Sequence, residues 1–149
     1  MLRDPNLIPL SHQHQHALAL CVQIDRSLQD GTADVEALQA QIGTMFNLEI
    51  RWHFAAEEQA LFPAAADFAE LEPLVKDLLA EHTVLRDYFA RAQARDLDGD
   101  GLRAFARLLS THIRKEERDL FEGCQRLFSP EKLSAVGAAL HAALESNSA

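Results

Sequence analysis

A histidine and glutamate pair that occurs twice is the feature that most constrains this chain. His53 and Glu57 lie in HFAAEEQALF, and 59 residues later His112 and Glu116 lie in HIRKEERDLF. On a helix, residues four apart are separated by roughly 40° of rotation and ~6 Å of rise, so each imidazole and its carboxylate project from one stripe. Two such stripes facing each other could hold metal between them. The repeat therefore predicts that both pairs are metal ligands on helices.

Size and composition predict a single domain over residues 1–149, located in the cytoplasm. A chain of 149 residues can bury a core without disulfides. With 14 Lys and Arg against 23 Asp and Glu, the net charge of −9 argues against nucleic acid or an anionic membrane as a partner. No stretch approaches the ~20 apolar residues of a membrane span. Cys21 and Cys124 are predicted to be reduced, buried thiols, with a disulfide between them as the alternative.

Helix breakers divide the sequence into five helical segments. No sustained period-two alternation indicates a sheet, so the predicted fold is all-α. Ser11 is the expected N-cap of the first helix, and Pro63 is expected to lie just beyond the end of the second. Short connections predict an up-down-up-down four-helix bundle over about residues 10–126, followed by a short C-terminal capping helix. The expected helices span about residues 11–28, 32–62, 73–94, 102–126 and 129–145, and the second begins near Thr32 or Asp34.

Each bundle helix is expected to carry one histidine within its apolar stripe. On the third helix this histidine is His82. On the first helix, positions at helical spacing from His14 are mostly apolar, and this histidine therefore fits the buried face best. His12 or His16 would replace it if the first helix were rotated.

These positions together predict a metal centre inside the bundle. Four histidines and two carboxylates buried without metal would carry a heavy desolvation cost, which a divalent cation compensates. Imidazole and carboxylate ligands without thiolate suit non-haem iron, manganese or zinc, and two carboxylates that can bridge favour a dinuclear centre. Glu58 and Glu117, ~100° further round their helices, are expected to hydrogen-bond the ligands or face solvent. The predicted ligands are His14, His53, Glu57, His82, His112 and Glu116.

The chain resembles the hemerythrin-like, or HHE cation-binding, family over about residues 10–126. The resemblance is carried by LSHQH at 10–14, HFAAEEQALFP at 53–63, the dipeptide Glu81-His82 and HIRKEERDLF at 112–121. It implies a four-helix bundle around two iron ions (Fe2+/Fe3+), with Mn or Zn as substitutes. It also implies terminal ligation by the four histidines and bridging by the two glutamates. The oxygen carriers of the family have a fifth histidine, paired with another on the third helix, whereas Leu78 and Arg86 lie four residues either side of His82.

The function implied by this resemblance is binding of O2 or a related diatomic or peroxide ligand. The protein would then act as a sensor, a store or an iron or redox-stress protein. One alternative is a di-iron oxidase or peroxide-decomposing enzyme that uses the same ligands. Another is an interaction module that metal merely stabilises. The sequence identifies no protein partner and leaves a homodimer open.

Overall fold

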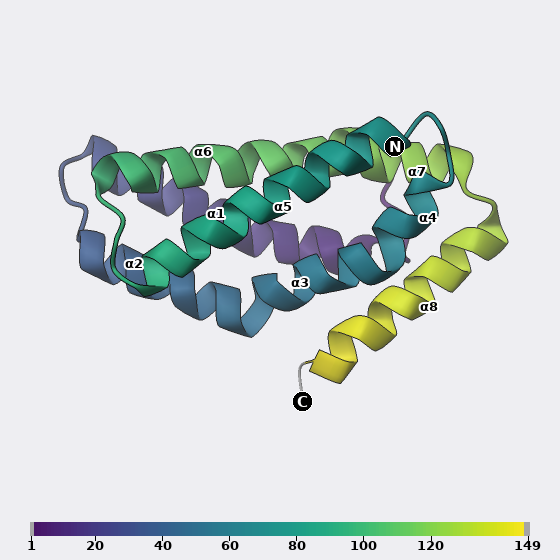
Figure 1. Ribbon diagram of the computed structural model, residues 1–149, viewed down its shortest axis with the longest axis horizontal. Helices are drawn as coiled ribbons and strands as arrows, with labels where there is room; N and C mark the ends of the chain where they lie inside the picture. Colours follow the sequence, from purple (N-terminus) through teal and green to yellow (C-terminus); the bar gives the residue numbers. More distant parts are fainter. Residues whose placement is uncertain (1, 148–149) are drawn as a thin grey trace.

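The described part of the chain is an all-α bundle. A computed structural model describes residues 2–147, so residues 1 and 148–149 of the predicted single domain lie outside the described residues. The described residues are 84% helical and form no strand. Four long helical segments run along the molecule, and a fifth helix lies at an angle on one side of them (Figure 1). The first segment is α1 (Ile8–Gln29), and the third is α5 (Glu72–Gln93). The second segment consists of α2 (Val35–Met45), η1 (Phe46–Ile50), α3 (Arg51–Ala56), η2 (Glu57–Leu61) and α4 (Phe62–Ala66). The fourth consists of α6 (Gly99–Lys115), η3 (Glu116–Phe121) and α7 (Glu122–Leu127).

Short connections between the long segments make consecutive neighbours antiparallel. Helix α1 packs against α6, and α2 packs against α5. The fifth helix, α8 (Pro130–Asn147), folds back from the end of α7 and lies across α3 and η2 (Figure 1). The predicted all-α bundle with a short C-terminal helix is confirmed. None of the described helices combines the length and apolar character that crossing a bilayer requires.

The predicted N-cap of the first helix, Ser11, is wrong by four residues. The helix begins at Ile8 with Leu7 at its N-cap, and Pro9 lies in the first turn. A proline is tolerated there because the N–H that it lacks would have no partner within the helix. Ser11 is therefore free of a capping role, and its hydroxyl donates to Glu117 at 2.7 Å.

The second helical segment does not stop at Pro63, as the sequence predicted, but continues to Ala66. The five residues of η2 before it form a wider π-helical turn, in which the Phe62 N–H donates to the Glu57 carbonyl. Proline in a regular helix clashes with the carbonyl four residues back and cannot donate to it. The wider turn replaces that bonding pattern, so the helix passes through the proline without a break.

Apolar side chains form two clusters, one on each side of a buried polar layer. One cluster includes Ile24, Phe89 and Phe105, and the other includes Phe121 and Leu140. Along each long segment, the buried histidine or glutamate lies between residues of the first cluster and residues of the second. The polar layer is therefore closed off from solvent at both ends by packed side chains.

The two cysteines are separated by this arrangement. Cys21 belongs to the first cluster and Cys124 to the second, and both are free and buried. Burial raises the pKa of each thiol to about 12, so both remain protonated near neutral pH. The predicted reduced thiols are confirmed, and the alternative of a disulfide between them is wrong.

Candidate metal centre

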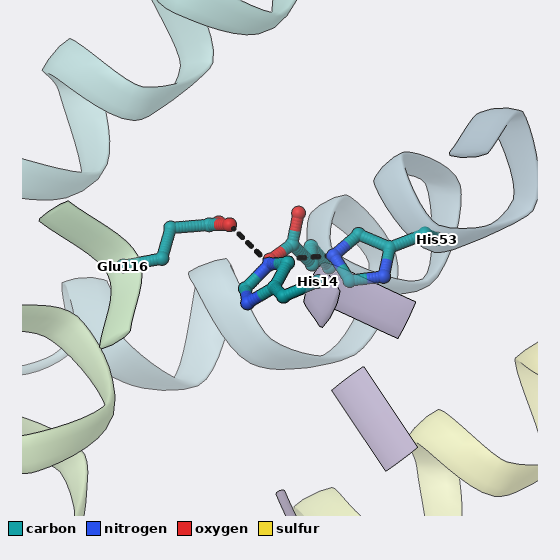
Figure 2. A group of neighbouring side chains, drawn as sticks. His14, His53 and Glu116 are labelled. Carbon is teal, nitrogen blue, oxygen red and sulfur yellow. Dashed lines mark hydrogen bonds and ion pairs between the residues drawn. The ribbon is translucent and has the colours of Figure 1, made fainter. Parts of the chain in front are cut away.

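The six side chains predicted as metal ligands converge in the polar layer at the middle of the bundle. His14 comes from α1, His82 from α5, and the two histidine and glutamate pairs from the second and fourth segments. Each of the six is at most 4% exposed. Figure 2 shows the Glu116 carboxylate and the rings of His14 and His53 pointing toward one another. Helical spacing places them here because each occupies the inward stripe of its own helix.

The six residues form two overlapping groups that could each hold a metal ion. One group is His14, His53, Glu57 and Glu116, and the other is Glu57, His82, His112 and Glu116. Within each group, one potential ligand atom from every residue lies within 4.8 Å of the others. Both glutamates belong to both groups. The arrangement therefore offers two adjacent cation positions that share two carboxylates.

Each glutamate approaches one histidine from its own helical segment and one from another. Glu57 lies 3.4 Å from His53 Nε2 and 3.2 Å from His82 Nε2. Glu116 lies 3.4 Å from His112 Nε2 and 3.0 Å from His14 Nε2. His82 of α5 thus contacts the glutamate of the first repeat, and His14 of α1 contacts the glutamate of the second.

Most of these buried polar atoms have no hydrogen-bond partner among the described residues. Both oxygens of Glu57, one oxygen of Glu116, and the Nε2 atoms of His82 and His112 are in this position. Their close approaches lack the geometry of hydrogen bonds. Leaving one buried polar group unsatisfied costs about 1–3 kcal/mol, and more for a charged group. The residues therefore fit a bound cation, which would satisfy carboxylate and imidazole lone pairs together.

Burial and mutual proximity shift the pKa values of the central groups in opposite directions. Burial, followed by the charge of Glu116, raises the pKa of Glu57 well above its usual range. Burial lowers the pKa of His53, with His14 adding to the effect. Burial opposes protonation of His112 as well, but Glu116 and Glu81 outweigh it and raise the pKa of His112 to about 9. In the metal-free protein, Glu57 and His112 therefore hold protons that a bound cation would have to displace.

The Nδ1 atom of each central histidine has its own hydrogen-bond acceptor. His14 pairs with Glu117 at 2.6 Å, and His82 pairs with Glu58 at 2.7 Å. A proton held on Nδ1 leaves the Nε2 lone pair directed toward the centre, and a carboxylate acceptor makes that lone pair more basic. Glu58 and Glu117 thus hydrogen-bond to histidines of the centre, which is one of the two roles expected for them from the sequence.

Two outer partners are not predicted from the sequence. Glu81 accepts from His112 Nδ1 at 2.7 Å and is held by Lys115, while the Gln13 side-chain oxygen accepts from His53 Nδ1 at 2.7 Å. Both residues precede a central histidine in the sequence, yet each binds the histidine of a different helix. Only the packing of the helices creates these pairs. The only feature of the sequence that points to Glu81 and Gln13 is that they directly precede His82 and His14.

The structure distinguishes the three histidines of α1. His14 is 4% exposed and lies within the centre, whereas His12 and His16 lie on the outer face of the helix. The alternative of a rotated first helix is therefore wrong. His141 is also exposed, on α8, where it pairs with Glu145.

Two wide helical turns begin at the glutamates of the repeat. The π-helical segments η2 and η3 start at Glu57 and Glu116, and η3 has no proline after it. Proline is therefore not their common cause. A single wide turn inserted in an α-helix is frequent at functional sites. Because bonding runs over five residues instead of four, both the leucine and the phenylalanine that follow each glutamate are buried.

The fold and the buried donor set define a helical-bundle protein with a cation-binding centre. A scan against known families matches residues 9–124 to the Hemerythrin HHE cation binding domain. The chain belongs to this family, as the sequence resemblance predicted, and is a hemerythrin-like cation-binding protein. Comparisons with curated proteins and with solved structures gave no significant match.

Proposed function

We propose that the protein binds two iron ions in the buried centre and uses them to bind O2 or a related small ligand. His14 and His53 would hold one ion and His82 and His112 the other, with Glu57 and Glu116 bridging. The observation that carries this proposal is that two four-residue groups share both carboxylates. Sharing of this kind favours a pair of adjacent cations over two independent sites.

Iron suits this donor set because imidazole and carboxylate together match a borderline metal, and no thiolate is present to select zinc or copper. When bound, iron would supply one-electron redox chemistry and coordination positions for a small ligand. Manganese or zinc would fit the same donors, and zinc would lack the redox chemistry. The side chains contribute charge compensation, fixed imidazole orientation and exclusion of water.

A small cavity beside the centre supports a ligand of a few atoms. Its volume is about 10 Å³, close to the space of one water molecule. Apolar walls from Ala17, Ile50, Leu109 and other residues lead to His14 and His53. A diatomic molecule or peroxide matches this size, whereas a large organic substrate does not. The cavity thus favours a sensor, store or stress-response role over an oxidase of bulky substrates.

The third helical segment offers no fifth histidine to the centre. Leu78 is buried among apolar side chains, and Arg86 is held outside by two bonds to Glu58, at 2.7 and 3.0 Å. A position that a fifth histidine would fill is therefore left to water or an external ligand. This supports reaction of the centre with O2 rather than reversible carriage of O2.

Metal analysis after anaerobic iron loading tests the centre. We expect two iron ions per chain, and a lower content for His53→Ala and for His112→Ala because each removes a ligand. His141→Ala is the matched control and should retain both ions. A firm content of zero would contradict the proposal, and a content of one would restrict it to a mononuclear site.

Visible spectra of the reduced, iron-loaded protein test the ligand. We expect mixing with O2 to oxidise the iron, without recovery under vacuum. Recovery under vacuum would instead indicate an oxygen carrier. Rapid turnover of added peroxide would favour the peroxide-decomposing enzyme, for which the cavity is equally suited. Iron that remains ferrous in the presence of O2 would favour the interaction module.

A further inference from the structure

The hydrogen-bond acceptors behind the four central histidines differ in charge. Both histidines of one candidate cation position, His82 and His112, pair through Nδ1 with a carboxylate. Glu58 lies 2.7 Å from Nδ1 of His82, and Glu81 lies 2.7 Å from Nδ1 of His112. A carboxylate that accepts the Nδ1 proton makes Nε2 of the same ring more basic and therefore a stronger metal donor. This position has two such rings.

The other candidate position, formed with His14 and His53, has one carboxylate and one amide behind its histidines. Glu117 lies 2.6 Å from Nδ1 of His14, whereas Nδ1 of His53 lies 2.7 Å from the side-chain oxygen of Gln13. An amide oxygen accepts the Nδ1 proton but carries no charge, and hydrogen bonds to a neutral acceptor are weaker than those to a carboxylate. His53 is therefore the weakest metal donor of the four histidines.

The Nε2 atoms that face the two positions differ as well. Within the described part of the chain, Nε2 of His82 and Nε2 of His112 are buried without a hydrogen-bond partner. Nε2 of His14 instead forms a hydrogen bond with Glu116 at 3.0 Å. That bond has to break before His14 can coordinate a cation, and breaking it costs free energy. The rings of His82 and His112 are thus the better prepared pair for metal.

We propose that the two positions bind metal with unequal affinity, and that Gln13 makes the position of His14 and His53 the weaker one. This inference rests on the proposed function, because it requires that both positions take an ion. The position of His82 and His112 fills first, and the ion beside His14 and His53 is the first to be lost to a chelator. Gln13 then sets how readily the centre gains and releases its second ion.

Titration of the metal-free full chain with Zn2+, in competition with a chelator of known affinity, tests the inference. Zn2+ has no redox chemistry, so the titration reports binding alone. We expect two ions to bind in two steps whose Kd values differ by roughly tenfold or more. Repulsion between adjacent cations also separates the two steps. The assignment of the steps therefore depends on variants that act on one step each.

Two variants exchange amide and carboxylate behind a single histidine. Gln13→Glu should strengthen the second step by roughly 10- to 100-fold and leave the first nearly unchanged. Glu58→Gln should weaken the first step by a similar factor, so both variants narrow the gap between the steps. The matched control is Gln15→Glu, which adds the same charge on the exposed face of α1, two residues from Gln13. This control should leave both steps as they are in wild type.

The possible outcomes separate this inference from the proposed function. Two ions bound with equal affinity by wild type would overturn the inference and leave the proposed function standing. The same holds if Gln13→Glu binds its second ion no more tightly than Gln15→Glu does. Binding of fewer than two ions by wild type would overturn the proposed di-iron centre, and the inference with it.

Discussion

Glu57 and Glu116 are carboxylates with no exposed surface, packed against each other and against four histidines. Burial and the neighbouring charge raise the pKa of Glu57, because its ionised form loses hydration and is repelled by Glu116. An acid whose pKa rises on folding reduces stability at any pH above its ordinary pKa. A bound cation reverses this effect by compensating the charge. The same residue thus destabilises the protein alone and stabilises the metal-bound form.

Glu57→Gln should separate these two effects. The glutamine has no charge to bury, so we expect the metal-free variant to unfold at the same temperature as wild type or higher. The variant should lose most of the additional stability that metal gives to wild type, because a bridging donor is missing. Thermal unfolding at pH 7, with and without added metal, measures both effects. A metal-free variant much less stable than wild type would contradict this account.

Gln13 is expected to act as a positioning residue for His53. Gln13→Ala removes the acceptor that fixes the His53 ring, so metal affinity should fall by roughly 10- to 100-fold. The control is Gln41→Ala, because Gln41 pairs with Gln23 on the exposed surface and should leave affinity unchanged. Competition with a chelator of known affinity gives the comparison. Equal affinities of the two variants would exclude a positioning role for Gln13.

Among the helices, α8 is the one that lies outside the four long segments. It carries Leu133, Val136 and Leu140 onto α3 and η2, where His53 and Glu57 originate. These contacts bury apolar surface that the bundle alone would leave exposed. The helix therefore supports the backbone that positions two of the six central side chains.

Leu140→Ala should lower the free energy of unfolding by about 2–5 kcal/mol, the usual cost of truncating a buried leucine. Leu140 is 2% exposed. Leu48→Ala is the matched control, since Leu48 is 76% exposed and its truncation should change stability very little. Denaturant unfolding of both variants measures the difference. Similar values for both would mean that α8 contributes little to the bundle.

Across the whole molecule, metal binding and folding are linked through protons. His112 has a pKa of about 9 in the folded protein without metal, above its unperturbed value of ~6.5. The resulting stabilisation is fully present below about pH 6.5 and is lost as the pH rises through about 9. Metal competes with that proton, because Nε2 of His112 cannot both carry a proton and coordinate.

The stabilisation due to metal should therefore grow between pH 6.5 and 9. We expect the difference in Tm between metal-loaded and metal-free protein to widen over this range, and chelation to remove it at each pH. Acidification below pH 6.5 should release metal and remove the difference. Thermal unfolding of matched samples across the pH range provides the measurement. A difference that stays constant with pH would show that His112 does not exchange a proton for metal.

Much of the centre could be predicted because helical periodicity relates sequence spacing directly to direction. His53 and Glu57, and their counterparts His112 and Glu116, must share a stripe on any regular helix. Periodicity also favoured His14 over its neighbours, which the structure supports. The predicted helix end at Pro63 was wrong because a π-helical turn accommodates a proline that would break a regular α-helical turn. Packing around the site determines which of the two turns forms.

The sequence by itself determined the all-α bundle, the inward faces of its helices and the side chains gathered in its middle. These depend on local periodicity and on the burial of apolar stripes. Only the tertiary structure decided that Glu81 and Gln13 bind histidines of other helices, and that both central carboxylates belong to two groups. The reason is physical: distances between helices follow from how their side chains interlock, and no spacing along one chain segment encodes them.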